Sequence, residues 1–171
     1  MTFTPRRLSP AMIVRAVGVP RGKRVGVLGL AFKPNTDDLR EAPALKIVAG
    51  LKKRGAKVTA FDPVAMTHAQ DVPELRNVTL AADAYDAARG ADAVAIITEW
   101  NEFRGMNLKR LKKLMRKPVL CDLRNIYEPQ DVEAAGMCHV GVGRGRPPIQ
   151  RRGTRGARGT KDDRRGQGQA A

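Results

Sequence analysis

Short runs of apolar residues recur along the middle of the chain, separated by segments in which the apolar positions are spaced differently. The run RVGVLGL at 24–30 is unbroken, which is typical of a strand buried on both faces of a parallel sheet. Similar runs predict further strands at 57–63, 78–80, 92–98, 118–122 and 138–143. Aromatic residues make up only 4% of the chain, so the predicted core is mostly aliphatic.

The segments between these runs predict helices. At 42–55, Leu45, Val48 and Leu51 form an apolar stripe at helical spacing, and Pro43 suits the first turn. Shorter helices are predicted at 83–91, 107–115 and 129–136. Strands that alternate with helices in this way predict an α/β fold with a doubly wound, mostly parallel sheet and helices on both faces.

The formal net charge of +15 is concentrated at the two ends of the chain. Residues 1–24 carry six Lys and Arg and no acid, and residues 144–171 carry nine Lys and Arg and two aspartates. The segment 25–143 has 17 basic and 15 acidic residues, which indicates a nearly neutral domain. The segment 144–171 is rich in Arg and Gly and has too few large apolar residues to form a core. This composition predicts that it is a disordered, basic C-terminal tail. Such a tail makes nucleic-acid binding through phosphate contacts one functional hypothesis.

Other features bear on the cellular compartment. No apolar stretch is long enough to span a bilayer, and the N-terminus lacks the apolar run of a signal peptide. Cys121 and Cys138 form neither a CxxC pair nor a metal-binding set, and Cys121 lies inside an apolar run. We therefore expect Cys121 to be a small core residue rather than a nucleophile, and the protein to be cytoplasmic.

Polar residues directly follow three of the predicted strands, in the stretches GLAFKPN, ITEWNEF and CDLRNIYEP. In parallel sheets, ligands bind beyond the carboxyl ends of the strands. A binding site is therefore expected where these three stretches meet.

The first stretch carries residues suited to anions. Gly29 lets the backbone approach a ligand closely, and Lys33 supplies a point charge for a phosphate. Arg40 is placed to reach a second anionic group. Asp37 and Asp38 either orient these cations or cap the following helix, and a solvated turn is an equally weighted alternative.

The third stretch carries Arg124, whose guanidinium is suited to bidentate phosphate binding. The alternative is a salt bridge from Arg124 to Asp122 or Glu128. If the ends of their strands converge, Lys33 and Arg124 together fit a diphosphate.

Several other polar residues have structural as well as functional interpretations. Asp62 ends a strand where dinucleotide folds place a ribose-binding acid, but the chain lacks GxGxxG, so a strand-end turn is favoured. Trp100 is expected to be a packing anchor, with Glu99 as a hydrogen-bond acceptor. His68 and His139 have no obvious Asp, Ser or Cys partner. We find neither a complete catalytic constellation nor a metal-binding cluster in the sequence.

Three ordered stretches together resemble the C-terminal domain of the UDP-glucose/GDP-mannose dehydrogenase family: RVGVLGLAFKPNTDDLREAPALKIVAGLKKRGAKVTAFDP, ADAVAIITEWNEFR and CDLRNIYEP. The resemblance covers about residues 11–143, and TEWNEF favours the UDP-glucose branch. It implies a Rossmann-like, UDP-sugar-binding domain at 23–143. It also implies that residues 1–22 are the end of the family's central helix.

The resemblance further implies roles for individual residues. Lys33, Arg124 and Phe32 would contact the UDP-sugar, and Arg40 would reach NAD bound by another domain. Family members oxidise UDP-glucose to UDP-glucuronate in two NAD-dependent steps through a cysteine, and they form homo-oligomers.

The sequence departs from the family pattern in several ways, which include the absence of the central region's lysine and the Arg/Gly tail in place of a short ending. It contains neither the GxGxxG motif of the NAD-binding domain nor the Gly-Ser-Cys motif of the catalytic cysteine. We therefore expect the chain to be inactive alone, as a fragment or one half of a two-part enzyme with an N-terminal NAD-domain polypeptide. A non-catalytic remnant or assembly module is the rival hypothesis.

Overall fold

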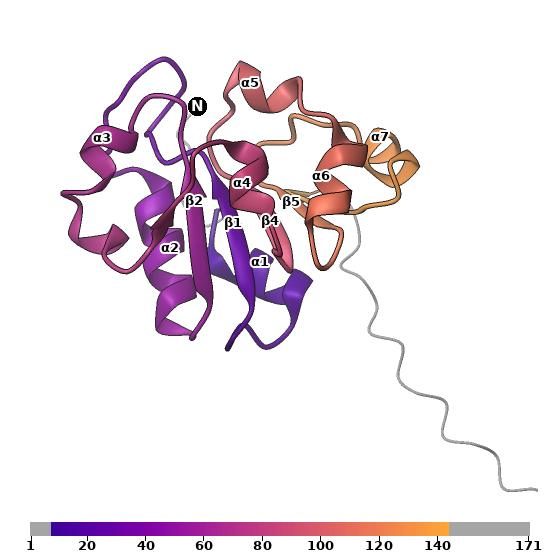
Figure 1. Ribbon diagram of the computed structural model, residues 1–171, viewed down its shortest axis with the longest axis horizontal. Helices are drawn as coiled ribbons and strands as arrows, with labels where there is room; N and C mark the ends of the chain where they lie inside the picture. The colour runs from indigo at the N-terminus through magenta and orange to yellow at the C-terminus, as the bar shows by residue number, and fades with distance from the viewer. Residues whose placement is uncertain (1–7, 144–171) are drawn as a thin grey trace, which may run out of the picture.

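A parallel sheet flanked by helices makes up the structure, a computed structural model that describes residues 8–143 (Figure 1). The tail predicted at 144–171 and the first seven residues lie outside the described part.

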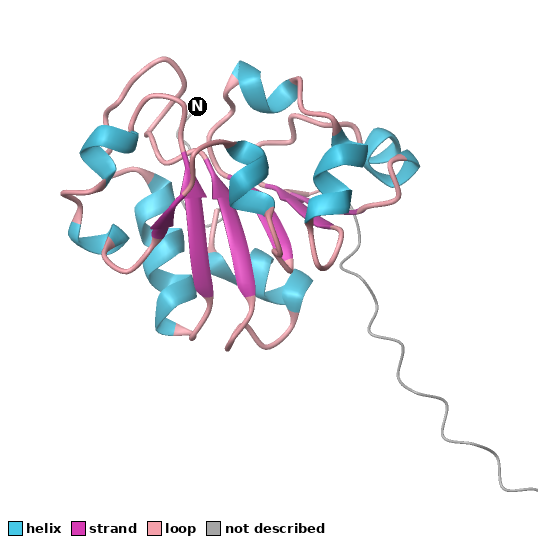
Figure 2. Ribbon diagram, viewed as in Figure 1, coloured by secondary structure: helices cyan, strands magenta, loops and turns pink. Residues whose placement is uncertain are grey.

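Six parallel strands form one sheet in the order β3-β2-β1-β4-β5-β6 (Figure 2). They are β1 (Arg24–Leu28), β2 (Lys57–Phe61), β3 (Thr79–Leu80), β4 (Ala93–Ile96), β5 (Val119–Asp122) and β6 (Cys138–Gly141). The predicted doubly wound parallel sheet is confirmed. The chain proceeds from β1 to β2 and β3, and then returns to β4 on the other side of β1. The topological switch point therefore falls between β1 and β4, where folds of this kind bind their ligands.

Helices cover both faces of the sheet (Figure 1). They are α1 (Pro10–Val17), α2 (Pro43–Lys53), α3 (Met66–Ala69), the 3₁₀ helix η1 (Pro73–Leu75), α4 (Ala84–Ala88), α5 (Asn101–Arg104), α6 (Leu108–Leu114) and α7 (Pro129–Ala134). The helix α1 packs on α2, β4 and β5, and α2 packs on β2. On the opposite face, α4 packs on β1, β2, β4 and α6.

The core is aliphatic, as the sequence predicts. All four residues of β4 are buried, because helices cover the strand from both sides. In α2 the stripe of Leu45, Val48 and Leu51 is buried against the sheet. Cys121 is completely buried within β5, which confirms it as a core residue.

The helix α1 occupies the segment predicted to be the end of a central helix. Its Ile13 is fully buried and Ala16 is nearly so. Since α1 covers β4 and β5 on the face that it shares with α2, it is part of the domain's packing. No helix within residues 8–143 has the length and apolarity needed to cross a bilayer.

Strand ends and short helices differ from the prediction. The strands β1, β2, β4 and β6 each stop before the predicted end, and α3, η1 and α5 were not predicted. The backbone φ of 91° at Gly29 turns the chain out of β1, although the apolar run continues to Leu30. Helices of three or four residues are too short to show a helical period in the sequence.

Candidate functional site

The three polar stretches meet at the carboxyl edge of the sheet. They follow β1, β4 and β5, which are adjacent and parallel, with Leu28 beside Ile96 and Ile96 beside Asp122. The segments that leave these strands therefore lie next to one another at the switch point. The sequence-based expectation of a common edge is confirmed.

Gly29 begins the first of these segments with a backbone conformation that residues with a side chain rarely adopt. A Cβ added there would lie 2.5 Å from the Cβ of Thr98, so only glycine fits. The Thr98 hydroxyl donates to the carbonyl of Ala31 at 2.7 Å, which ties the loop to the end of β4. The amide of Phe32 donates to the carbonyl of Asp38 at 2.8 Å and closes the loop.

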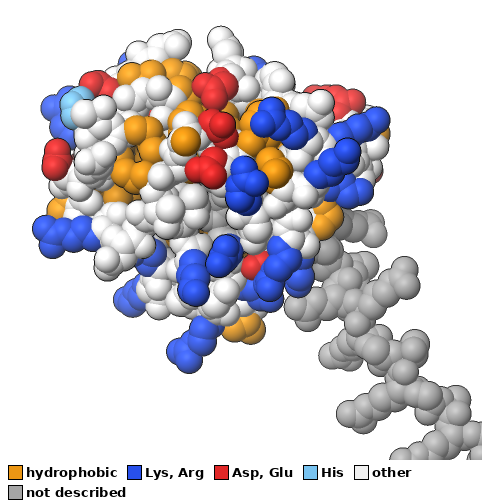
Figure 3. Space-filling model, in the orientation of Figure 1, with side chains coloured by type: hydrophobic (Ala, Val, Ile, Leu, Met, Phe, Trp, Pro, Cys, Tyr) orange, Lys and Arg blue, Asp and Glu red, His pale blue; other side chains and the backbone are white. Residues whose placement is uncertain are grey.

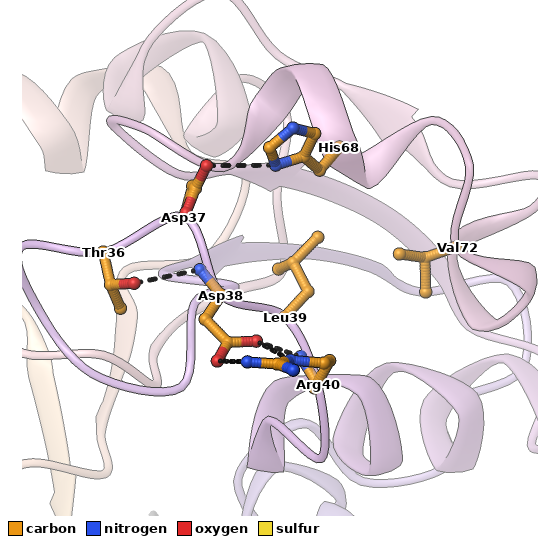
Figure 4. Close-up of a pocket in the computed structure, with 7 residues that line it drawn as sticks. All are labelled: Thr36, Asp37, Asp38, Leu39, Arg40, His68 and Val72. Carbon is orange, nitrogen blue, oxygen red and sulfur yellow. Dashed lines mark hydrogen bonds and ion pairs between the residues drawn. The ribbon is translucent and has the colours of Figure 1, made fainter.

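Arg40 is oriented by Asp38 (Figure 4). Its Nε and Nη2 each donate to a carboxylate oxygen at 2.9 Å, and this hydrogen bonding lowers the pKa of Asp38 to about 2. The Arg40 side chain remains 89% exposed. Asp38 thus orients a cation, as one alternative predicts, and the exposure of the pair also agrees with the alternative of a solvated turn. The helix-capping alternative is wrong, because Ala42 is the N-cap of α2 and no side chain caps it.

Asp37 pairs with His68 beside this loop, with 3.2 Å between Oδ2 and Nδ1. The prediction that His68 lacks an acidic partner is wrong. The loop after β1 and the helix α3 after β2 follow adjacent parallel strands, and this brings the two residues together. With Leu39 and Val72 they line an open pocket of about 470 Å³ (Figure 4).

Arg124 forms an ion pair with Glu99, whose Oε2 accepts from Nε. The side chains are only 20% and 29% exposed, respectively. Burial would raise the pKa of Glu99, but the bond from Arg124 outweighs it, so the pKa is lowered. The predicted role of Glu99 as an acceptor is confirmed. Glu99 was not among the acids that the sequence suggested as partners of Arg124, and Asp122 accepts the backbone amide of Arg124 at 3.2 Å.

Asp62 is fully buried at the end of β2. Its Oδ1 accepts the amides of Val64 and Ala65 at 3.0 and 2.9 Å, which confirms the predicted strand-end turn. Its Oδ2 accepts the indole N–H of Trp100 at 3.1 Å and two amides of the β1 loop. Trp100 is 7% exposed and is a packing anchor, as predicted. Sequence reasoning missed the long-range bonds of Oδ2, because their donors lie far along the chain.

Asp122 supports the segment that carries Arg124. Its Oδ2 accepts the amide of Tyr127 at 2.9 Å, and Nε2 of His139 lies 3.7 Å from the same oxygen, beyond hydrogen-bond distance. Burial would raise the pKa of Asp122, but His139 and the backbone amides that face the carboxylate outweigh it, so the pKa is lowered. The prediction that His139 has no acidic neighbour is therefore wrong. The pairing of β5 with β6 brings the two residues together.

The residues with predicted ligand roles all lie beyond the strand ends: Phe32, Lys33, Arg40 and Arg124. Phe32 is 52% exposed, which is high for a large apolar side chain, and Lys33 is also exposed. This edge of the sheet thus offers cations and an aromatic ring to a ligand, a combination that suits a phosphate-bearing molecule. Within residues 8–143, no group of three or more His, Cys, Asp or Glu is arranged to hold a metal ion.

A dinucleotide does not fit the crevice of this domain in the usual way. The strand order is that of dinucleotide-binding folds, in which a glycine-rich turn follows β1 and an acid after β2 binds the ribose. Here GxGxxG is absent after β1, and the carboxylate of Asp62 is buried and bonded internally.

The strand order and the cationic edge define a Rossmann-like α/β domain with a site at its switch point. Residues 26–129 match the model of the UDP-glucose/GDP-mannose dehydrogenase family, UDP binding domain. The chain belongs to this family.

Individual relatives agree with this assignment. The UDP-glucose 6-dehydrogenase of Rhizobium meliloti (strain 1021) is 46% identical over 139 residues, which are 81% of this chain and 31% of that protein. The UDP-glucose 6-dehydrogenase TuaD of Bacillus subtilis (strain 168) is 39% identical over 132 residues, 77% of this chain and 28% of that protein. The chain therefore spans about a third of the length of these curated relatives.

Solved structures show the same relationship. A UDP-glucose dehydrogenase from Pyrobaculum islandicum matches with a TM-score of 0.59 and 37% identity, over 69% of this chain and 25% of that chain. A UDP-D-ManNAc dehydrogenase from Pyrococcus horikoshii matches with a TM-score of 0.66 and 29% identity, over 82% of this chain and 31% of that chain.

Proposed function

We propose that this domain binds the diphosphate of a UDP-sugar at the carboxyl edge of β1, β4 and β5. The observation that carries the proposal is that the segments bearing Lys33 and Arg124 leave the same edge, with the segment of Glu99 between them. A diphosphate needs two cations from different directions, and a guanidinium held by a carboxylate has lost much of its freedom before the ligand arrives. Phe32 is proposed to pack against the ligand.

UDP-glucose is the sugar nucleotide that we propose. The relatives named above from Rhizobium meliloti and Bacillus subtilis are UDP-glucose 6-dehydrogenases, and the stretch TEWNEF favours the same branch of the family. We accordingly propose that the domain serves the oxidation of UDP-glucose to UDP-glucuronate, in the cytoplasm and within a homo-oligomer.

The oxidant in this proposal is NAD bound outside the domain. The domain's own crevice does not fit a dinucleotide in the usual way, whereas the exposed Arg40, which Asp38 holds, is proposed to reach one bound by another domain. The 171 residues contain no Gly-Ser-Cys motif, so we expect the chain alone to bind UDP-glucose without oxidising it. An NAD-domain polypeptide that supplies the cysteine would complete the reaction.

Isothermal titration of UDP-glucose into the full chain tests the binding proposal, with GDP-mannose as the competing ligand. Lys33→Ala and Arg124→Ala should each weaken binding about tenfold or more, since a hydrogen bond to a charged group contributes roughly 1.5–3 kcal/mol. Lys113→Ala, an exposed lysine on α6, is the matched control and should leave the affinity unchanged.

Two results would count against the proposal. Unchanged affinity in both site variants would place the ligand elsewhere. Absence of binding by a chain shown by circular dichroism to be folded would favour a non-catalytic remnant or assembly module.

Nucleic-acid binding receives less support from the described residues. On the face in Figure 3, Lys and Arg side chains lie in several places, and a row of Asp and Glu side chains runs down the upper centre. A polyanion on this face would meet both signs of charge. The basic tail lies outside the described residues.

A further inference from the structure

Asp62 lies where dinucleotide-binding folds place a ribose-binding acid, but all of its bonds are internal. The donors to Oδ1 are the amides of Val64 (3.0 Å) and Ala65 (2.9 Å), and those to Oδ2 are the amides of Leu30 (2.8 Å) and Ala31 (3.0 Å) and the indole Nε1 of Trp100 (3.1 Å). A carboxylate has about four lone-pair positions, so five N–H donors saturate it. The group is also fully buried, which leaves no acceptor for an external hydroxyl.

Two of these donors belong to the loop that carries the cation Lys33. Leu30 and Ala31 directly precede Phe32 and Lys33 in the chain. Both amides point at one carboxylate oxygen, so Asp62 determines where the loop leaves the sheet. The bond from the Thr98 hydroxyl to Ala31 holds the same loop against β4.

A third donor belongs to the segment that holds the other cation. Trp100 directly follows Glu99, and the carboxylate of Glu99 binds the guanidinium of Arg124. The indole of Trp100 is buried, and its N–H points at Asp62. The position of Glu99, and through it that of Arg124, is therefore tied to the same carboxylate.

We propose that Asp62 is a positioning residue for the ligand site. One buried carboxylate couples the loop of Lys33 to the Glu99–Arg124 pair, and so sets the spacing at which the two cations meet a diphosphate. The inference rests on the proposed function as far as the ligand is concerned. The coupling between the two segments is a property of the protein alone.

Trp100→Phe tests the coupling, because it removes one donor to Asp62 and retains an aromatic ring. By titration with UDP, well below the melting temperature, we expect this variant to bind about three- to tenfold more weakly, as the loss of one hydrogen bond implies. Val132→Ala is the matched control, since it removes buried volume in α7 without touching the network, and it should bind like wild type.

A double-mutant cycle separates positioning from general destabilisation. If Trp100 acts through Arg124, then Trp100→Phe should have little further effect in an Arg124→Ala background. An equal loss of affinity in both backgrounds would show that Trp100 does not act through Arg124. Asp62→Asn replaces one carboxylate oxygen with an NH2 group, so a single acceptor oxygen remains for the five N–H donors, and it keeps the indole. Where that variant folds, combining it with Trp100→Phe should weaken binding no more than Asp62→Asn alone.

A measurement on the ligand-free protein tests the coupling of Trp100 to Arg124 independently of the proposed function. Solvent exchange of the Arg124 Nε–H, followed by NMR, should be several-fold faster in Trp100→Phe than in wild type, and unchanged in Val132→Ala. Unchanged exchange in Trp100→Phe would overturn the positioning role. Faster exchange in a chain that never binds UDP would uphold it and reject the proposed function instead.

Discussion

At the scale of single residues, the Glu99–Arg124 pair predicts a pH dependence of stability. Folding lowers the pKa of Glu99 below its ordinary value of 4.5. The pair therefore stabilises the fold above about that pH, and its contribution is lost as the pH falls through the folded-state pKa. Glu99→Gln should lower the free energy of unfolding by about 1 kcal/mol at pH 7 and by much less near pH 3.

Urea unfolding of wild type and variant at both pH values measures this difference. Glu102→Gln is the control, because it makes the same change of Glu to Gln at an exposed position in the adjacent helix α5. A constant difference between wild type and Glu99→Gln from pH 7 to pH 3 would contradict the argument.

The two cysteines should differ in reactivity for a reason that is also local. Burial raises the pKa of Cys121 to about 12, and the side chain has no access to solvent. Cys138 is only partly buried, although burial raises the pKa of its thiol as well. With a thiol-specific reagent at pH 8, we expect slow modification of Cys138 and none of Cys121 until the chain unfolds. Two equivalents modified at one rate in the native protein would refute this.

A contact between two residues could be predicted only where the partners lie close together in the chain. The turn at Asp62 involves its near neighbours, and a strand-end Asp-Pro favours such a turn in any sequence. The bonds from Asp62 to Trp100 and from Asp37 to His68 join segments that only the fold brings together. No spacing in the sequence specifies them.

At the scale of the elements, the turn at the end of β1 depends on a glycine. Gly29 has a φ of 91°, and an added Cβ would lie 2.5 Å from the Thr98 Cβ. Gly29→Ala should therefore combine backbone strain of roughly 1–2 kcal/mol with a steric clash against β4. Gly22→Ala is the matched control, because its φ is 74° and nothing lies within 4 Å of an added Cβ.

Thermal and urea unfolding of the two variants separate these contributions. The control should lose only the strain energy, and Gly29→Ala should lose at least about 1 kcal/mol more. Equal losses would mean that the loop relaxes away from Thr98 without penalty.

Elements were predictable where burial imposes a pattern on several consecutive residues. The stretch that follows Arg24 is apolar because β1 is buried on both faces, and the stripe in α2 reflects one buried face. Strand ends were less predictable, since Leu30 remains buried after the strand has turned away. Its amide then bonds to Asp62, which no local pattern indicates.

At the scale of the whole molecule, the sequence predicts a parallel sheet but not its strand order. Alternating strands and helices require crossover connections, which make neighbouring strands parallel. The return of the chain to place β4 beside β1 depends on how the helices fill the two faces, and this is a property of the assembled layers. The common edge for Lys33 and Arg124 follows from that return.

The packing of the layers depends on the helix α1. The sequence suggested that this segment was only the end of a longer helix. Ile13 is fully buried where α1 packs against α2, β4 and β5. Ile13→Ala should therefore lower the free energy of unfolding by about 2–5 kcal/mol, the usual range for a large aliphatic side chain removed from a core. Val19→Ala, just after α1 at 76% exposure, should change it by less than about 0.5 kcal/mol. If urea unfolding gave the two variants similar stabilities, α1 would be an attached segment, and β4 and β5 would keep their packing without it.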